Sequence, residues 1–358
     1  MSKKSPMSKR RRTERTRAVT VVVLLCLSVG VLASCLSLAV PPGPPYETVI
    51  EPFEVLGPMG NTIHGQIRRP DPALYPGSVF PAVILVPGGI NPGRMEVHGA
   101  DARALSEQGM VVVCFNAEGR IDTLAPDDLR SEGAEDFNGF RHQEGLANLI
   151  EYVAVLDYVD ETNIGLKSQS YGITMAAGCV GRYPDLPIRY LIDGEGPPIG
   201  FVTCHGPRFL AGDVQKYNTV LGIFGRLATW QAASQENLDW WYEREAINFI
   251  GQFRGSYLRL QATWDHAQPP ESQAEIATYH HPGGWPGGGP AWWHNKHTID
   301  IVNAAIAGGV PWVRVNLPPQ KNAVNATYDA SNPPTYLPGR LADQPWAVRA
   351  ILEMSGLI

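Results

Sequence analysis

The sequence predicts an α/β fold in which helices flank a mostly parallel sheet of eight strands. The first observation is a set of continuously apolar runs, such as residues 80–88 and 110–116, which is the pattern of strands buried on both faces. The second is the alternation of such runs with helix-forming segments after residue 80. The third is the high content of Gly (37) and Pro (31) among 358 residues, which suits a loop-rich chain.

The expected elements follow one another in a simple order. The first two strands have no helix between them and should form a hairpin. The eight expected strands are 47–55, 61–68, 80–88, 110–116, 162–168, 188–194, 257–263 and 311–317, and the expected helices are 94–108, 140–158, 171–182, 237–252, 295–308 and 343–356. Two long stretches, about 197–236 and 271–294, do not fit this alternation. We interpret them as insertions over the carboxyl edge of the sheet, where α/β proteins bind ligands.

The first 34 residues have the pattern of an export signal. A basic segment precedes an uncharged apolar run, which ends in Leu-Ala-Ser-Cys at residues 32–35. This tetrapeptide resembles the bacterial lipoprotein box, which implies a lipid on Cys35 and a cell-envelope location. A plain signal peptide, giving a secreted protein, or an uncleaved anchor helix remain alternatives. The Pro-rich residues 35–46 are expected to form a stiff spacer before the folded domain.

Charge and cysteine content exclude several classes of partner. Residues 1–34 hold eight of the 29 Lys and Arg residues and one of the 35 Asp and Glu residues, which leaves 21 basic and 34 acidic residues and a net charge of −13. Such a surface repels nucleic acid and anionic lipid, so any membrane link should be the N-terminal anchor alone. The widely spaced Cys114, Cys179 and Cys204 indicate neither a disulfide framework nor a zinc site, and we expect no metal or cofactor.

The turn after the fifth expected strand carries the main catalytic candidate. Residues 168–172 read Ser-Gln-Ser-Tyr-Gly, with small residues at 168, 170 and 172 between a strand and a helix. Such a turn can hold Ser170 above the sheet as a nucleophile. The alternative is an inert Ser- and Gly-rich turn.

From about residue 45 to the end, the strand order and this turn resemble the α/β-hydrolase fold. The nearest match is the dienelactone-hydrolase and prolyl-oligopeptidase-like branch of serine hydrolases. The fold's motif is Gly-x-Ser-x-Gly, and this chain has Ser168 at the first position. The resemblance implies one α/β-hydrolase domain over residues 47–358, a Ser170 nucleophile and an acyl-enzyme intermediate.

The resemblance also implies an oxyanion hole and an acid. In VILVPGGI (83–90), Pro87-Gly88 replaces the common His-Gly, so the N–H of Gly89 becomes one donor and that of Tyr171 the other. Asp265 follows the seventh strand, where the fold carries the acid that orients the histidine. The alternatives are a glycine turn at residue 89 and an Asp that caps the next turn.

The catalytic histidine is missing from its usual place. The loop after the eighth strand, 318–339, contains no His, and Asn322 stands near the expected position. We expect the base to come from His297, in the first turn of a helix capped by Asn295, or from His294 just before it. The third alternative is that no catalytic histidine exists.

These observations predict an exported serine hydrolase acting on small-molecule carboxylic esters, with a serine peptidase as the second candidate. A catalytically inactive surface lipoprotein that serves as a binding module is the alternative from another class. Polar residues at the carboxyl edge of the sheet are expected to shape the pocket: Glu118, Arg120, Arg141, Gln143, Asp193 and Glu195.

Overall fold

We analysed a computed structural model of the chain. The structure describes residues 45–89, 97–121, 130–198, 234–264, 291–329, 331–341 and 345–358, except for the side chains of Trp264 and residues 291–296. The predicted signal, Cys35, Asp265 and almost all of the two predicted insertions lie outside the described residues. Residues Tyr46–Ile358 form one compact unit.

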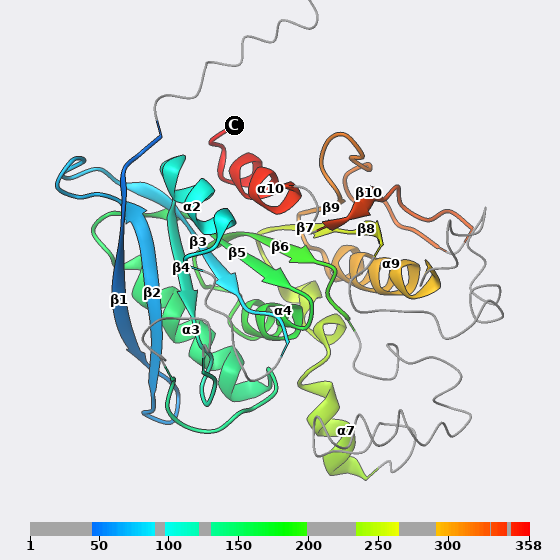
Figure 1. The fold of residues 1–358 in the computed structure, drawn as a ribbon. Helices are drawn as coiled ribbons and strands as arrows, with labels where there is room; N and C mark the ends of the chain where they lie inside the picture. The colour runs from blue at the N-terminus through cyan, green and yellow to red at the C-terminus, as the bar shows by residue number, and fades with distance from the viewer. Residues whose placement is uncertain are drawn as a thin grey trace, which may run out of the picture. The chain divides into compact units, whose positions relative to one another are not determined.

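An eight-stranded sheet forms the centre of this unit (Figure 1). The strand order is β1-β2-β4-β3-β5-β6-β7-β9. The β1–β2 and β2–β4 pairs are antiparallel. The β4–β3 pair and every later pair in this order are parallel. The strands are β1 (Thr48–Leu56), β2 (Thr62–Pro70), β3 (Phe80–Val86), β4 (Val111–Phe115), β5 (Val159–Gln169), β6 (Ile188–Gly194), β7 (Ser256–Leu260) and β9 (Trp312–Val315). The sheet is therefore mixed, and all eight expected strands and the hairpin are confirmed.

Helices cover both faces of the sheet. Figure 1 shows α2 and α10 on one face and α3 and α4 on the other. The helices are α2 (Ala100–Glu107), α3 (Phe140–Ala154), α4 (Gly172–Arg182), α7 (Gln235–Tyr242), α9 (Ala291–Gly308) and α10 (Trp346–Ser355). Because α9 begins at Ala291, Asn295 lies inside the helix, and the expectation that it caps the helix is wrong.

The sheet divides the interior into two hydrophobic cores, one on each face, because alternate residues of a strand point to opposite faces. On β3, Ile84 packs in the core of the α3 and α4 face with Leu166 and Ile173. Its neighbour Val83 packs in the core of the α2 and α10 face with Tyr190. This double burial explains the continuously apolar strand sequences.

Two local features differ from the sequence expectation. The predicted helix 237–252 is α7 followed by two short 3-10 helices, Ala246–Asn248 and Ile250–Gln252. In this second part, Gly251 lies against Gly308 of α9, where a side chain on Gly308 would meet Gly251 backbone atoms. A small parallel sheet, β8 (Ala262–Trp264) with β10 (Leu337–Arg340), was not expected.

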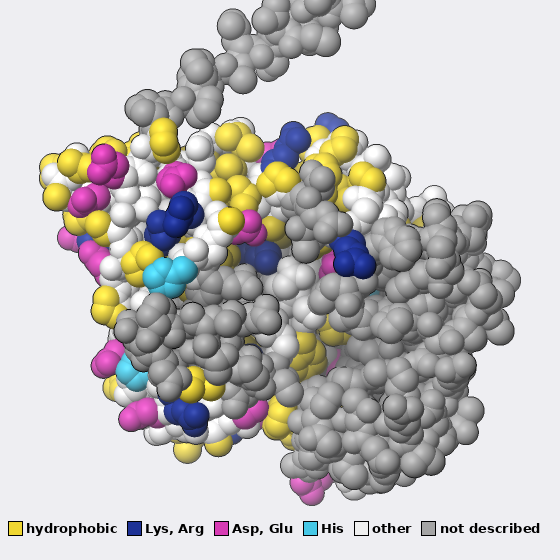
Figure 2. Space-filling view, in the orientation of Figure 1, with side chains coloured by type: hydrophobic (Ala, Val, Ile, Leu, Met, Phe, Trp, Pro, Cys, Tyr) yellow, Lys and Arg dark blue, Asp and Glu magenta, His cyan; other side chains and the backbone are white. Residues whose placement is uncertain are grey.

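Among the described residues, the helices are all too short or too polar to cross a bilayer. On the face drawn in Figure 2, the described acidic and basic side chains are interspersed rather than gathered by sign.

Candidate active site

Ser170 lies on a sharp turn between β5 and α4. Its backbone has φ = +50°, a left-handed conformation that is uncommon for residues other than glycine. Its N–H donates to the Gly194 carbonyl oxygen at the end of β6 (2.8 Å). Two positions at this turn have room only for glycine. A Cβ on Gly172, in the turn, would lie 2.7 Å from the Pro87 carbonyl oxygen, and one on Gly88, in the neighbouring segment after β3, would lie 2.6 Å from that of Gln169. The strand, turn and helix therefore have the geometry of a nucleophile elbow.

The two predicted oxyanion donors belong to segments that meet at this elbow. Strands β3 and β5 are paired as far as Val86 and Ser168, so the glycines after β3 lie beside the turn after β5. Gly89 has φ = +70°, which favours glycine at this position. Tyr171 is the N-cap of α4, whose first N–H groups lack partners within the helix. The arrangement is suited to holding a negative charge near Ser170.

A buried polar network braces the elbow from the α3 side. Asn138, fully buried with φ = +63°, donates from Nδ2 to the Tyr171 carbonyl oxygen (2.8 Å). Arg120, also fully buried, donates from Nη2 to Asn138 Oδ1 (2.6 Å) and binds Glu135 through two hydrogen bonds of 2.9 Å each. The Tyr171 hydroxyl donates to the Phe137 carbonyl oxygen (3.2 Å). Tyr171 is thus held at its backbone carbonyl and at its hydroxyl group.

Burial and charge set the protonation states in this network. Burial alone would raise the pKa of Glu135, but the hydrogen bonds and the charge of Arg120 outweigh it and lower that pKa overall. Burial, with the charge of Arg120 as a second cause, lowers the pKa of His142 to about 3. His142 Nδ1 accepts from the Asn138 N–H (3.2 Å), and Nε2 lies 3.2 Å from the Asp136 backbone nitrogen and 2.9 Å from the Glu118 carbonyl oxygen.

These contacts correct the expectation that Arg120 and Gln143 line a pocket. Both side chains are fully buried. Gln143 donates to the carbonyl oxygens of Asn138 (2.9 Å) and Glu243 (2.7 Å), and therefore ties the elbow brace to the segment after α7. Both residues therefore stabilise the elbow from the buried α3 side.

A second buried network lies at the ends of β6, β7 and β9. Arg259 donates to Asp193 Oδ2 (2.6 Å), and Tyr257 donates to the same oxygen (2.8 Å). Arg259 also donates to Gln261, whose N–H donates to Asn316 Oδ1. Asp193 is fully buried and paired, so the expectation that it contacts substrate is wrong.

Glu195 follows directly after β6 and is also buried. It has φ = +54°, and its Oε1 accepts from the Ala262 N–H (3.2 Å). Its neighbour Gly194 accepts the hydrogen bond from Ser170. The carboxylate of Glu195 thus joins the end of β6 to the start of β8.

The predicted acid and bases are placed only in part. Asp265 directly follows β8 and lies outside the described residues, as does the side chain of His294 on α9. His297 is fully buried in α9. Its neighbour Thr298 donates to Gln261 Oε1 (3.2 Å), which places this part of α9 at the carboxyl end of β7. Because β6 separates β7 from β5, that end lies about 10 Å across the sheet from the elbow strand.

Asn322 has a structural role in the loop after β9. Its Nδ2 donates to the carbonyl oxygens of Val315 (2.9 Å) and Thr335 (2.8 Å), and its Oδ1 accepts from the Thr335 N–H (2.7 Å). The side chain that stands where the fold usually has its histidine therefore closes the loop on itself.

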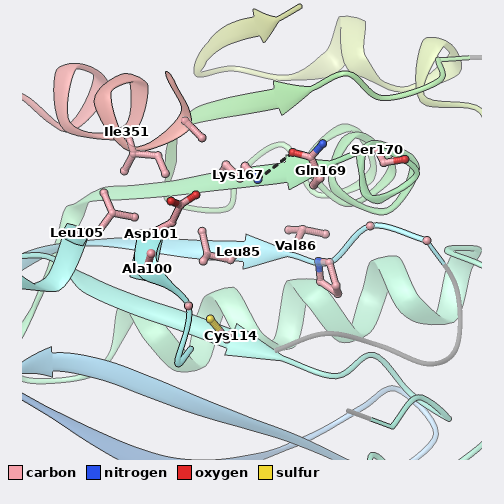
Figure 3. A pocket seen from close by; sticks show the side chains of 15 residues that line it. Leu85, Val86, Ala100, Asp101, Leu105, Cys114, Lys167, Gln169, Ser170 and Ile351 are labelled. Atoms are coloured by element: carbon pink, nitrogen blue, oxygen red, sulfur yellow. Dashed lines mark hydrogen bonds between the residues drawn. The ribbon is translucent and has the colours of Figure 1, made fainter. Parts of the chain in front are cut away.

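A cavity of about 420 Å³ adjoins the elbow on the α2 and α10 face. Figure 3 shows it bounded by the ends of β3 and β5, by α2 and by Ile351 of α10. Ser170, Gly88 and Gly89 lie at one end, and Lys167 lies along β5. Sequence reasoning missed Lys167 and Asn138. A lysine in a central strand was the available signal for the first, and an Asn-Gly pair before a helix for the second.

Solved structures show which proteins share this arrangement. A puromycin hydrolase superimposes with a TM-score of 0.55 at 15% identity, over 88% of this chain and 40% of that one. An esterase from the archaeon Pyrobaculum calidifontis gives 0.50 at 16% identity, over 87% and 85%. The fold is that of the α/β-hydrolases.

Dipeptidyl peptidase 4 of Porphyromonas gingivalis also has this α/β-hydrolase fold, with a TM-score of 0.50 at 15% identity, over 74% of this chain and 31% of that one. The chain thus spans about a third of that peptidase and most of the esterase. The sequence matches no protein-family model and none of the curated proteins. At these identities the likeness establishes the fold, and the structural neighbours are hydrolases.

Proposed function

We propose that the protein is a serine hydrolase that cleaves carboxylic esters through an acyl-enzyme. The observation that carries this proposal is the backbone of Ser170, which adopts φ = +50° at a turn where Gly88 and Gly172 admit no side chain. A non-glycine residue in this conformation costs free energy, and such strain collects at functional sites. The adjoining cavity supplies space for a substrate.

In the proposed reaction, Ser170 Oγ bonds to the ester carbonyl carbon while a histidine accepts its proton. The N–H groups of Gly89 and Tyr171 stabilise the oxyanion that forms. The alcohol leaves with the proton, and water then hydrolyses the acyl-enzyme to the acid. Asp265 is proposed to orient the histidine.

We propose a base from the His294–His297 segment, because the loop after β9 carries Asn322 instead of a histidine. Comparison of His297→Ala and His294→Ala separates the two: loss of the true base should lower turnover by about 10³-fold.

We also propose export and lipid attachment at Cys35, from the basic and apolar leader that precedes it. The intact mass of the exported protein tests this directly. A mature chain that starts elsewhere, or an unmodified Cys35, would contradict it.

A fluorophosphonate probe and a panel of 4-nitrophenyl esters test the catalytic proposal. We expect the probe to label wild type and not Ser170→Ala, and the variant to lose turnover while its melting profile stays nearly unchanged. Wild type that neither reacts with the probe nor hydrolyses any ester would instead favour the binding module, the reading supported by the closed Asn322 loop.

A further inference from the structure

A buried arginine follows α7, a helix that lies beyond α4 on the side away from the sheet (Figure 1). Arg244 is 2% exposed, although it belongs to a segment at the periphery of the fold. A guanidinium group buried to this extent loses its hydration, which costs free energy unless several acceptors replace the water. The acceptors that Arg244 contacts therefore indicate its role.

Arg244 joins the end of α7 to the loop before α3. Nη2 donates to the Asp136 carbonyl oxygen (2.8 Å) and to Asp136 Oδ1 (2.7 Å), and Nε donates to the same carbonyl oxygen (3.1 Å). On the α7 side, Nη1 donates to the Trp240 carbonyl oxygen (2.7 Å), and the guanidinium group lies over the Trp240 ring, 3.9 Å from its centroid. The planar fork of one side chain thus fixes the distance between the two segments.

The loop that Arg244 binds is the loop that holds the elbow. Directly after Asp136, Phe137 (φ = +50°) and Asn138 (φ = +63°) are two consecutive non-glycine residues in the left-handed conformation. Such a backbone costs free energy and persists only where surrounding contacts fix it. The Phe137 carbonyl oxygen accepts from the Tyr171 hydroxyl, and Asn138 donates to the Tyr171 carbonyl oxygen. Arg244 therefore anchors the residue next to the pair that positions Tyr171.

Gly139 shows how closely Arg244 packs against this loop. Gly139 has φ = −73° and an extended backbone, a conformation open to any residue, so the backbone does not require glycine here. A Cβ at this position would overlap the guanidinium group of Arg244 and would lie 2.8 Å from Asp136 Oδ2. Glycine is therefore needed at residue 139 to admit Arg244.

We propose that Arg244 is a positioning residue for the oxyanion hole, because it fixes the strained loop through which Asn138 holds Tyr171. This inference rests on the proposed ester hydrolysis. Gln143 provides a second link between the same segments, since it donates to the carbonyl oxygens of Asn138 (2.9 Å) and Glu243 (2.7 Å). The cavity lies on the opposite face of the sheet, so loss of Arg244 should displace the oxyanion donor and leave substrate binding nearly unchanged.

The first test measures the hydrolysis of 4-nitrophenyl butyrate by Arg244→Met and Arg244→Lys. We expect Arg244→Met to lower kcat about tenfold with KM within about twofold of wild type, because an oxyanion donor acts on the transition state. Arg244→Lys should keep part of the activity, because it retains the charge but not the fork.

Arg69→Met is the matched control. Arg69 also makes two hydrogen bonds to one carboxylate, that of Glu51 (2.8 and 3.0 Å), and also lies over an aromatic ring, 4.0 Å from the centroid of Tyr158. It belongs to β2, which β4 and β3 separate from the elbow strand β5. An equal loss of kcat in Arg69→Met and Arg244→Met would overturn the inference.

Gly139→Ala displaces the guanidinium group of Arg244 while keeping its charge. We expect kcat to fall about threefold to tenfold, and the double variant Gly139→Ala/Arg244→Met to match Arg244→Met within about twofold, because both changes act through one contact. Losses that multiply in the double variant, or an Arg244→Met enzyme that keeps kcat within about twofold of wild type, would contradict the proposed role.

Hydrogen exchange keeps this inference separate from the catalytic proposal. The Thr174 N–H donates to the Tyr171 carbonyl oxygen (3.2 Å), so its exchange reports on the place of that carbonyl. We expect this amide to exchange about tenfold faster in Arg244→Met and at the wild-type rate in Arg69→Met, under conditions where global unfolding does not contribute. Unchanged exchange in Arg244→Met overturns the inference while ester hydrolysis stands. If wild type hydrolyses no ester, the catalytic proposal fails, and exchange alone decides whether Arg244 holds the elbow.

Discussion

Asn138 offers a sharp test of how the elbow is held. Asn138→Asp keeps the size of the side chain and tolerates the left-handed backbone. One carboxylate oxygen of the new Asp can still accept from Arg120. The other carboxylate oxygen takes the place of Asn138 Nδ2 and faces the Tyr171 carbonyl oxygen, which Nδ2 now contacts at 2.8 Å. Two acceptors then repel each other, and Tyr171 is expected to shift.

The expected loss follows from the proposed role of Tyr171 as an oxyanion donor. Removal of one such donor typically costs about 10²- to 10³-fold in kcat, so its displacement should cost about 10- to 100-fold. We expect kcat to fall with little change in KM, because the donor acts on the transition state. Binding of a trifluoromethyl ketone, which forms an oxyanion with Ser170, should weaken by the same factor.

Asn163→Asp is the matched control. Asn163 is buried in the middle of β5 and donates from Nδ2 to the Ser355 carbonyl oxygen of α10 (2.9 Å), a bond of the same kind. Both variants should lower the free energy of unfolding by about 1–3 kcal/mol. Equal losses of kcat in the two variants, or an Asn138→Asp enzyme that keeps wild-type kcat, would refute the reasoning.

Two further predictions concern stability. Folding lowers the pKa of His142 from its ordinary value of 6.5 to about 3. Between these two pH values, the unfolded chain binds a proton at His142 that the folded protein does not bind. The free energy of unfolding should therefore fall as the pH drops below 6.5, by about 2 kcal/mol at pH 5, and urea titrations should show a shallower pH dependence in His142→Asn. Asp193→Asn removes one partner of the buried pair with Arg259 and should cost about 3–5 kcal/mol in the same assay, whereas Tyr257→Phe should cost about 1 kcal/mol; similar losses would contradict the ion-pair interpretation.

The sheet could be predicted from the sequence because its signal is local. A strand buried on both faces must be apolar throughout, and the expected boundaries of β3 and β6 agree with the structure to within two residues. The elbow could also be predicted, because Gly172 is required by the local backbone geometry and the small residues at 168, 170 and 172 lie between a strand and a helix. The β8–β10 pair was missed because its two short strands are about 75 residues apart, and neither has a pattern of its own.

The supports of the site were missed for a different reason. Arg120 and Asp193 are charged residues after strands, a pattern that resembles pocket-lining residues as much as buried ones. Only the tertiary partners, Glu135 and Arg259, decide that both are buried ion pairs. The helix after residue 237 was predicted too long because the close approach of Gly251 to Gly308 cannot be inferred from either segment alone.

The brace and the cavity lie on opposite sides of the elbow, and this separation bears on how the protein could change over evolution. Asn138 and Arg120 support the turn from the α3 side, whereas the cavity wall is formed by small or aliphatic residues of α2 and α10, such as Ala100 and Ile351. In the proposed esterase, substitutions in that wall would alter which acyl group fits without touching the bonds that hold the turn. New specificities are therefore reachable through single steps that leave the chemistry intact, and a mutant library for altered substrate range should be confined to that wall.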